Sequence, residues 1–389
     1  MIDLTRARYL GLAHPRDALA RWDALTSGRP AVLGEHPAIA GLAHRLAALV
    51  GLERATLAPS TLHVVTDLFA ALPQRVRRVH LDACTYAVSR WGLERAQLRG
   101  VEVITFHSPR ELERQLRCDG ASAIVCDSVC VACRTVKPLR RLQHLAAAAR
   151  GWLIVDDSQG VGLLGERPSR AQPYGGGGGG TLRFEAAAPE RVIAIGSLAK
   201  AFGAPLAFLA GDASTVAWFE RTSGTRIHAS PCNAAALAAL HAALAANATC
   251  GDSLRARLVD RVAAFRAAVA GAGGELRRGL FPVQTTPPLR PQRANAIAAR
   301  LERRGVAVLR LRATAGRQCL GFVITADADR TALARAGATV GMTLVVTSRC
   351  EEASRGETVI GVIRSPRDRH RRPCGLDRRD HRPDRPAVA

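Results

Sequence analysis

This 389-residue chain contains two lysines, Lys137 and Lys200, although lysine and arginine together number 55. Arginine can serve wherever charge alone is needed. It fails where a compact amine must lose its proton and act as a nucleophile, because guanidinium stays protonated. Lys200 follows an apolar run in IGSLAKAFG, so we single it out as a candidate catalytic amine, with chance retention as the alternative. Lys137, in RTVKPL, lacks that context, and we interpret it as a solvated or loop lysine.

Three further features could complete a site around that amine. Asp156 ends the run LIVDD, where a carboxylate could keep a pyridine nitrogen protonated. Ser60 and Thr61 precede a helical pattern, and hydroxyls with free N–H groups at a helix start suit a phosphate. Tyr86 could stack on a planar ring. Each has a structural alternative (a strand-end acid, an N-cap, a core tyrosine), but together they predict a site for pyridoxal 5'-phosphate, whose aldehyde a lysine can bind as a Schiff base.

Alternating strands and helices must position these residues. Apolar runs of strand length occur at 77–83, 101–106, 121–127, 151–157, 191–197 and 206–211. Helical patterns separate several of them, which predicts an α/β fold with a mostly parallel sheet flanked by helices. Ligands of such sheets lie at the carboxyl ends of the strands, so we expect DACTY, CDSVC, DDSQG and GSLAK around one crevice.

Composition along the chain predicts three parts. Residues 1–231 form an N-terminal segment and a large cofactor-binding domain, and residues 232–340 form a smaller α/β C-terminal domain. Residues 341–389 form an Arg/Pro-rich tail that buries too little apolar surface to order itself. Within the first part, residues 15–71 have a helical pattern, and the six glycines at 175–180 indicate a flexible loop.

The formal net charge of +22 raises the alternative of a nucleic-acid-binding protein, but scattered arginines and an aromatic content of 4% disfavour it. No apolar run reaches the roughly 20 residues of a membrane span, and no export signal opens the chain. We therefore expect a cytoplasmic protein with reduced thiols and no membrane partner. Cys130 and Cys133 form a CxxC with Cys126 nearby, but no second ligand cluster accompanies them, so no metal site is predicted.

The chain also resembles a known family. Eight segments match in one order from about Tyr9 to about Ala328: RYLGL, HPAIAGLAHRLAALVG, LAPSTLHVV, DACTYA, CDSVCVACRTVKPL, VDDSQGVGLLGERP, GSLAKAFG and IHASPCNAAAL. They are similar to the fold-type-I pyridoxal-phosphate enzymes of the class I/II aminotransferase superfamily. Within these enzymes the chain looks like the α-oxoamine synthase group, which includes 8-amino-7-oxononanoate synthase.

The resemblance implies roles for individual residues. Lys200 would hold the cofactor covalently, and Asp156 would pair with its pyridine nitrogen. The other implied cofactor contacts are Tyr86 over the ring, Ser60, Thr61, the amide of Leu62 and Ser197 at the phosphate, and Ser128 and Gln159 near the phenolic oxygen. The implied reaction is decarboxylative condensation of an amino acid or amine with an acyl thioester, in a homodimer. Transamination is the alternative, since it needs the same lysine, ring and aspartate.

Two departures from the family's pattern limit this reading. Gln159 stands where relatives carry histidine; it can donate a hydrogen bond but cannot change protonation near pH 7. Gly321 stands where relatives carry the arginine that clamps the substrate carboxylate in two-point geometry. Arg226, Arg310 or Arg317 could replace that arginine from a neighbouring element. A catalytically weak homologue is the further alternative.

Overall fold

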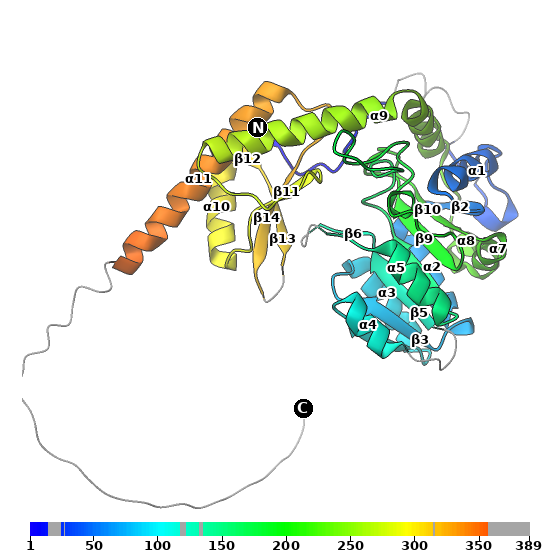
Figure 1. The fold of residues 1–389 in the computed structure, drawn as a ribbon. Helices are drawn as coiled ribbons and strands as arrows, with labels where there is room; N and C mark the ends of the chain where they lie inside the picture. The colour runs from blue at the N-terminus through cyan, green and yellow to red at the C-terminus, as the bar shows by residue number, and fades with distance from the viewer. Residues whose placement is uncertain (15–24, 27, 117–121, 132–134, 314–315, 357–389) are drawn as a thin grey trace, which may run out of the picture. The chain divides into compact units, whose positions relative to one another are not determined.

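The computed structural model describes residues 1–389 except 15–24, 27, 117–121, 132–134, 314–315 and 357–389, and it describes residues 347–356 by their backbone only (Figure 1). Contacts between Cα atoms divide the chain into one unit of residues 1–347 and a second of residues 348–389. Among the described residues, the second unit contributes only the last turns of helix α11 (Arg330–Gly356). The division that we predict at residue 231 is not tested by these units and stays a prediction.

The larger sheet of the first unit, which we call the central sheet, has seven strands in the order β2-β10-β9-β8-β5-β3-β4 (Figure 1). Its strands are β2 (Arg54–Ala58), β3 (Arg78–Asp82), β4 (Glu102–Phe106), β5 (Ser122–Asp127), β8 (Trp152–Asp156), β9 (Val192–Ser197) and β10 (Ala207–Gly211). All neighbours are parallel except β10, which runs antiparallel to both β2 and β9. The predicted α/β class with a mostly parallel sheet is confirmed.

Helices cover both faces of this sheet, which explains why its strands are continuous apolar runs. Along β8, Leu153 and Val155 pack into one apolar cluster and Ile154 into another. The first cluster includes side chains of α1, α4, α5 and α9, and the second includes side chains of α2, α3 and α7. The helices of this region are α1 (Ala38–Val50), α2 (Thr61–Ala71), α3 (Ala87–Gln97), α4 (Pro109–Gln115), α5 (Leu139–Ala148), α6 (Thr181–Phe184), α7 (Ala213–Thr222) and α8 (Gly224–His228), with 3-10 turns η2 (Ala31–Leu33) and η3 (Leu72–Gln74).

A second, smaller sheet has the antiparallel order β11-β14-β13. Its core includes the rings of Phe265 and Phe322, whose centroids lie 5.6 Å apart. The elements of this region are α9 (Ala234–Gly271), β11 (Val283–Thr285), α10 (Pro291–Arg303), β12 (Val306–Ala307), β13 (Leu309–Arg312), β14 (Gln318–Val323) and α11. This region therefore combines helices with a small antiparallel sheet.

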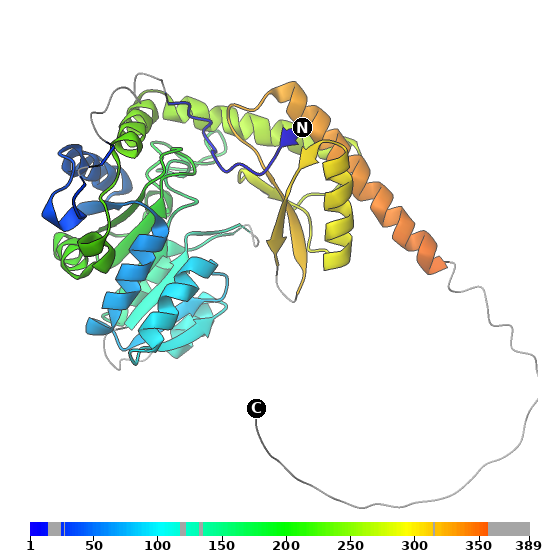
Figure 2. The ribbon, with the colours of Figure 1, turned by 180° about the vertical axis from the view of Figure 1, so that it is seen from behind.

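The N-terminal segment, dark blue in Figure 2, begins beside this smaller sheet. Strand β1 (Ile2–Asp3) pairs in parallel with β12. Further along, the Leu4 carbonyl accepts a hydrogen bond from the Val323 amide at 2.8 Å, and the Tyr9 carbonyl accepts one from the Ala326 amide at 2.8 Å. Residues at the start of the chain therefore join elements more than 290 positions away.

Helix α9 is long and apolar enough, by length and composition, to cross a bilayer, and it is the one described helix that meets this test. Half of its most apolar window is buried inside the protein. Leu237 and Leu240, for example, belong to the apolar cluster against the central sheet. A core helix of this kind meets the same criterion, so the test gives little support to a membrane span.

The six-glycine run is an ordered turn, and the prediction of a flexible loop is wrong. Its backbone forms bridges with neighbouring segments, between Gly176 and Glu166 and between Gly179 and Val161. Gly180 has a φ of +91°, and a Cβ at this position would lie 2.1 Å from an Asp157 carboxylate oxygen. Glycine is needed at Gly180 because a side chain would not fit there, and the backbone bridges hold the rest of the turn in place.

Two boundaries also differ from the sequence-based expectation. Within 15–71, residues 15–24 lie outside the described residues, but Arg54–Ala58 is strand β2 instead of helix, because it pairs with β10 and lies in the core sheet. The tail was expected to start at 341, whereas α11 continues to Gly356 and Thr343 is fully buried. The Arg/Pro-rich residues 357–389 lie outside the described part of the chain.

Candidate active site

The carboxyl ends of the central parallel strands bring the predicted site segments to one edge of the sheet. Asp127 at the end of β5 is directly opposite Asp156 at the end of β8, and Asp156 is opposite Ile195 on β9. Ser197, two residues further on, ends β9. Parallel neighbours end at the same level, so DACTY, CDSVC, DDSQG and GSLAK meet there.

Lys200 lies in the tight turn between β9 and β10. The Leu198 amide donates to the Leu206 carbonyl at 2.8 Å, and Gly203 closes the turn with a φ of +62°. Leu198 and Phe202 on either side of the lysine are fully buried and hold its backbone in place. Burial lowers the pKa of Lys200 below its ordinary value, while the charge of Asp156 opposes the shift. Its amine therefore loses its proton more readily than a surface lysine, as a nucleophile requires.

The two aspartates that end β8 have different environments. Asp156 is partly buried, and its Oδ1 accepts a hydrogen bond from the Ser158 amide at 2.9 Å. Asp157 is fully buried and accepts bonds from the amide and hydroxyl of Thr181 at 2.9 and 2.6 Å. Burial raises the pKa of Asp157 to about 6. Asp157 thus holds the glycine turn through Thr181. Asp156 is the carboxylate of the pair that lies at the sheet edge near Lys200.

Asp127 is a third carboxylate at this edge, and the sequence analysis did not select it. Its Oδ2 accepts a hydrogen bond from the Tyr86 amide at 3.0 Å, whereas its buried Oδ1 has no hydrogen-bond partner among the described residues. Burial, followed by the charge of Asp156, raises the pKa of Asp127 well above its ordinary value. In the sequence, Asp127 ends the strand-like run that leads into CDSVC just as Asp156 ends the run that leads into DDSQG. That shared position at a strand end could have identified Asp127 as a site residue.

Lys137 lies in the loop after β7, as one of the two alternatives predicts, but it is not solvated. Its Nζ lies 2.6 Å from Oδ2 of Asp82 at the end of β3, and the two side chains are only 15% and 5% exposed. The short hairpin of β6 (Val129–Cys130) and β7 (Thr135–Val136) returns the chain to this edge, where the Lys137 amide donates to the Ser128 carbonyl at 2.8 Å. Burial lowers the pKa of Lys137, but the hydrogen bond and charge of Asp82 more than offset it, so the pKa is raised.

The residues expected at a phosphate lie at the other end of the same edge. Ser60 is the N-cap of α2, with its Oγ 2.8 Å from Nδ1 of His63. The first amides of α2, those of Thr61 and Leu62, have no intrahelical acceptor because they open the helix. Ser197 and Ala58 are both paired with Ala207 of β10, so β2 and β9 end two strand spacings apart, roughly 10 Å.

The remaining predicted contacts surround Asp156. Gln159 is partly buried, and its Oε1 accepts a hydrogen bond from the hydroxyl of Tyr9. Tyr86 is the N-cap of α3, its backbone amide donates to Asp127, and the residue is 65% exposed. Ser128 is fully buried, and its amide donates to the Asp156 carbonyl at 2.9 Å. The predicted residues therefore share one edge, although Ser128 offers no exposed surface.

The structure separates the three arginines that could replace the one missing at Gly321. Gly321 is paired with Leu309, and a Cβ at Gly321 would lie 2.9 Å from a methyl of Leu311. Arg310 alternates with these leucines and so projects from the opposite face of the sheet. Arg317 is an exposed residue directly before β14. An apolar surface therefore stands at the position of the missing guanidinium.

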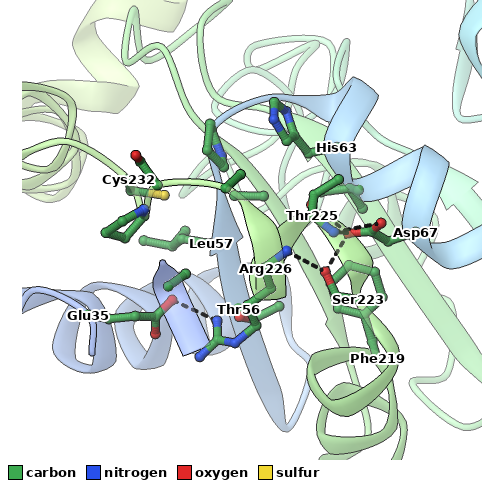
Figure 3. Close-up of a pocket in the computed structure, with 17 residues that line it drawn as sticks. Glu35, Thr56, Leu57, His63, Asp67, Phe219, Ser223, Thr225, Arg226 and Cys232 are labelled. Atoms are coloured by element: carbon green, nitrogen blue, oxygen red, sulfur yellow. Dashed lines mark hydrogen bonds and ion pairs between the residues drawn. The ribbon is translucent and has the colours of Figure 1, made fainter. Parts of the chain in front are cut away.

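Arg226 is engaged elsewhere. Its Nη1 lies 2.6 Å from Oε1 of Glu35 in a pocket of about 30 Å³ between β2, α2 and α8 (Figure 3). In the same pocket Asp67 accepts hydrogen bonds from the hydroxyls of Ser223 and Thr225 (Figure 3). These partners fix the start of α8, so the polar groups of the pocket bind one another. The Arg226 guanidinium is paired with Glu35 and is not free to bind a substrate carboxylate.

Comparison with known sequences places these residues in a family context. The profile of the family described as aminotransferase class I and II matches residues 1–336. The 8-amino-7-oxononanoate synthase of Aromatoleum aromaticum is 32% identical over 299 residues, which cover 76% of this chain and 72% of that protein. The enzyme of the same name from Serratia marcescens is 28% identical over 312 residues, 78% of each chain.

Solved structures share the fold. The chain is similar to serine palmitoyltransferase of Sphingomonas wittichii, with a TM-score of 0.77 and 16% identity over 90% of this chain and 88% of that one. It is also similar to 8-amino-7-oxononanoate synthase of Francisella tularensis, with a TM-score of 0.72 and 18% identity over 91% of this chain and 99% of that one.

Proposed function

Because the chain belongs to the aminotransferase class I and II family and is related to 8-amino-7-oxononanoate synthases, we propose that it is a pyridoxal-phosphate-dependent transferase of the α-oxoamine synthase type. Its reaction is the condensation of an amino acid with an acyl thioester, with release of carbon dioxide and thiol. The observation that carries the proposal is Lys200, an amine of lowered pKa at the same sheet edge as Asp156.

The residues at this edge fit the cofactor group by group. An aldehyde needs a nucleophilic amine, which Lys200 offers. A pyridine nitrogen needs a carboxylate, which Asp156 offers with one oxygen bound to the Ser158 amide. A phosphate needs N–H and hydroxyl donors, and these are the first amides of α2 with Ser60 and, across β10, Ser197. We assign Thr61 and Leu62 to the same phosphate group.

Each of these side chains has a defined task in such a reaction. The bound cofactor supplies an electron sink for the substrate carbon. The Asp156 carboxylate holds a proton on the pyridine nitrogen, because a buried negative charge favours the protonated form. The Lys200 amine would hold the cofactor's aldehyde and, when free, would move protons at the substrate carbon. Gln159 would donate a hydrogen bond from its amide, and Tyr86 would stack on the ring.

The amino acid substrate is not held by an arginine at position 321. Gly321, Leu309 and Leu311 present an apolar surface there, and Arg310 lies on the other face of that sheet. An aliphatic group of the substrate fits that surface better than a carboxylate does. A carboxylate against leucine side chains would lose its hydration without gaining a partner, which costs free energy.

Transamination is the second candidate, because the family description includes aminotransferases. The two reactions differ in their products. Carbon dioxide and free thiol from an amino acid and an acyl thioester support condensation. Conversion of the cofactor to its amine form without carbon dioxide supports transamination. Bound cofactor whose absorbance no amine perturbs would identify a catalytically weak homologue, as the departures at Gln159 and Gly321 allow.

The lysine content makes a sharp test of the cofactor site. Borohydride reduction of the protein loaded with pyridoxal phosphate, followed by peptide mapping, should modify Lys200 and leave Lys137 unmodified. Lys200→Ala should abolish the labelling and turnover, whereas Lys137→Arg, which keeps the charge beside Asp82, should retain both. Labelling at Lys137, or unchanged turnover of Lys200→Ala, would refute the assignment.

A homodimer is part of the same proposal. Val32, Leu33 and Ile227 are exposed apolar side chains on η2 and α8, which are joined by a hydrogen bond from the Ala31 amide to the Ala229 carbonyl at 3.1 Å. A second copy of the chain would cover them. Light scattering of the purified protein tests this.

We also propose a cytoplasmic location, the absence of nucleic-acid and membrane partners, and a domain division at residue 231.

A further inference from the structure

Tyr9 and Gln159, 150 positions apart in the chain, are joined by a hydrogen bond at the edge of the candidate site. The phenol donates and Oε1 of the Gln159 amide accepts. This direction follows from burial: Tyr9 is only 1% exposed, and among the described residues its hydroxyl has no other partner. If the hydroxyl accepted from the amide nitrogen instead, its own hydrogen would be buried without an acceptor, which is costly.

Tyr9 is held rigidly from outside the central sheet. Its carbonyl accepts from the Ala326 amide at 2.8 Å, and its ring packs edge-on against Phe281 with centroids 6.0 Å apart. Burial raises the pKa of the phenol above its ordinary value, so it remains a neutral donor. The hydroxyl is therefore a fixed point against which the glutamine amide is oriented.

Gln159 lies three residues after Asp156 in a tight turn, where the amide of Gly160 donates to the Asp157 carbonyl at 2.9 Å. With Oε1 bound to Tyr9, the Nε2 group is directed elsewhere, and it makes no hydrogen bond to any described residue. In an amide the oxygen and the nitrogen lie on different sides of the carbonyl carbon, so binding the oxygen to Tyr9 turns the nitrogen away from Tyr9. The result is an N–H donor kept available at the edge that also carries Asp156.

We propose that Tyr9 is a positioning residue that holds Gln159 with its amide nitrogen toward the phenolic oxygen of pyridoxal phosphate. This rests on the proposed function. Without the phenol, the amide can turn and present its oxygen to another oxygen, which is repulsive. A donor at the phenolic oxygen withdraws electron density that otherwise stabilises the protonated nitrogen between Lys200 and the cofactor. Losing that donor should therefore raise the pKa of this nitrogen.

The test uses full-length protein loaded with pyridoxal phosphate, and the pKa is read from absorbance against pH. Tyr9→Phe should raise it by about 0.5–1 unit, the worth of one hydrogen bond. Tyr174→Phe is the matched control, because this tyrosine is also buried and donates to the Leu280 carbonyl at 2.5 Å. The control should lose stability to a similar extent and leave the absorbance pKa unchanged.

Gln159→Glu provides a second variant in case Tyr9→Phe folds poorly, since it keeps an acceptor for Tyr9 and removes the amide donor. It should raise the absorbance pKa at least as much, and adding Tyr9→Phe to it should change nothing further. An unshifted pKa in both single variants, or an equal shift in Tyr174→Phe, would overturn the role of Tyr9 alone. Absence of labelling at Lys200 in the wild type would instead overturn the proposed function.

Discussion

Breaking the ion pair between Lys137 and Asp82 should destabilise the protein far more than breaking an exposed pair. The variant is Lys137→Met, which keeps most of the aliphatic stem and removes the charge. Asp82 is then left buried, and the Cys84 amide, which donates to its carboxylate at 2.7 Å, stays in place. Removing one partner of a fully buried pair costs about 3–5 kcal/mol. Because Lys137 retains some contact with water, we expect about 2–3 kcal/mol.

The assay is urea unfolding at pH 7, with the free energy taken from the midpoint shift and the slope of the transition. Arg141→Met is the matched control, since Arg141 forms a 2.8 Å pair with Glu113 in which both side chains are exposed. Its cost should stay below about 1 kcal/mol and shrink in high salt. Asp82→Asn combined with Lys137→Met should recover part of the loss, because no orphaned charge remains. Equal midpoints for Lys137→Met and Arg141→Met would refute this reasoning.

Three further predictions concern the same edge. The pKa of Asp157, about 6 in the folded protein, exceeds its ordinary value of 3.8, so its contribution to stability is present in acid and is lost as pH rises through about 6. Relative to Asp157→Asn, the wild type should therefore lose about 2 kcal/mol of unfolding free energy between pH 4 and 7, as measured by urea unfolding at each pH; parallel curves would contradict it. Gly180→Ala should cost more than about 2 kcal/mol by the same assay, because its Cβ meets Asp157, whereas Gly177→Ala, also at positive φ but with nothing within 4 Å, should cost about 1 kcal/mol. Asp156→Asn should lower kcat by about 100-fold or more in steady-state assays while leaving the melting temperature near the wild-type value; a small kcat effect would remove Asp156 from the chemistry.

Local sequence features were sufficient for much of the fold. Strands such as β5, β8 and β9 are short apolar runs ending in polar residues, and that pattern is produced by burial on both faces of a parallel sheet. Strand β2 was missed because its alanine-rich sequence has no strong strand preference, and its pairing with β10 decides its state. The sequence alone was enough to select Lys200 as a candidate, because it is one of two lysines among 55 basic residues and directly follows an apolar run of strand length.

Contacts between distant segments could not be read in the same way. The glycine run is ordered because Asp157 and its neighbours occupy the space that side chains would need. Lys137 is buried because a hairpin brings it to Asp82, 55 positions earlier in the chain. The order of motifs along the sequence therefore determined the family and singled out Lys200 as the candidate nucleophile. Strand register and packing between remote segments decided that Asp127 lies opposite Asp156 and that Tyr9 binds Gln159, because periodicity describes a residue's own element and not its partner.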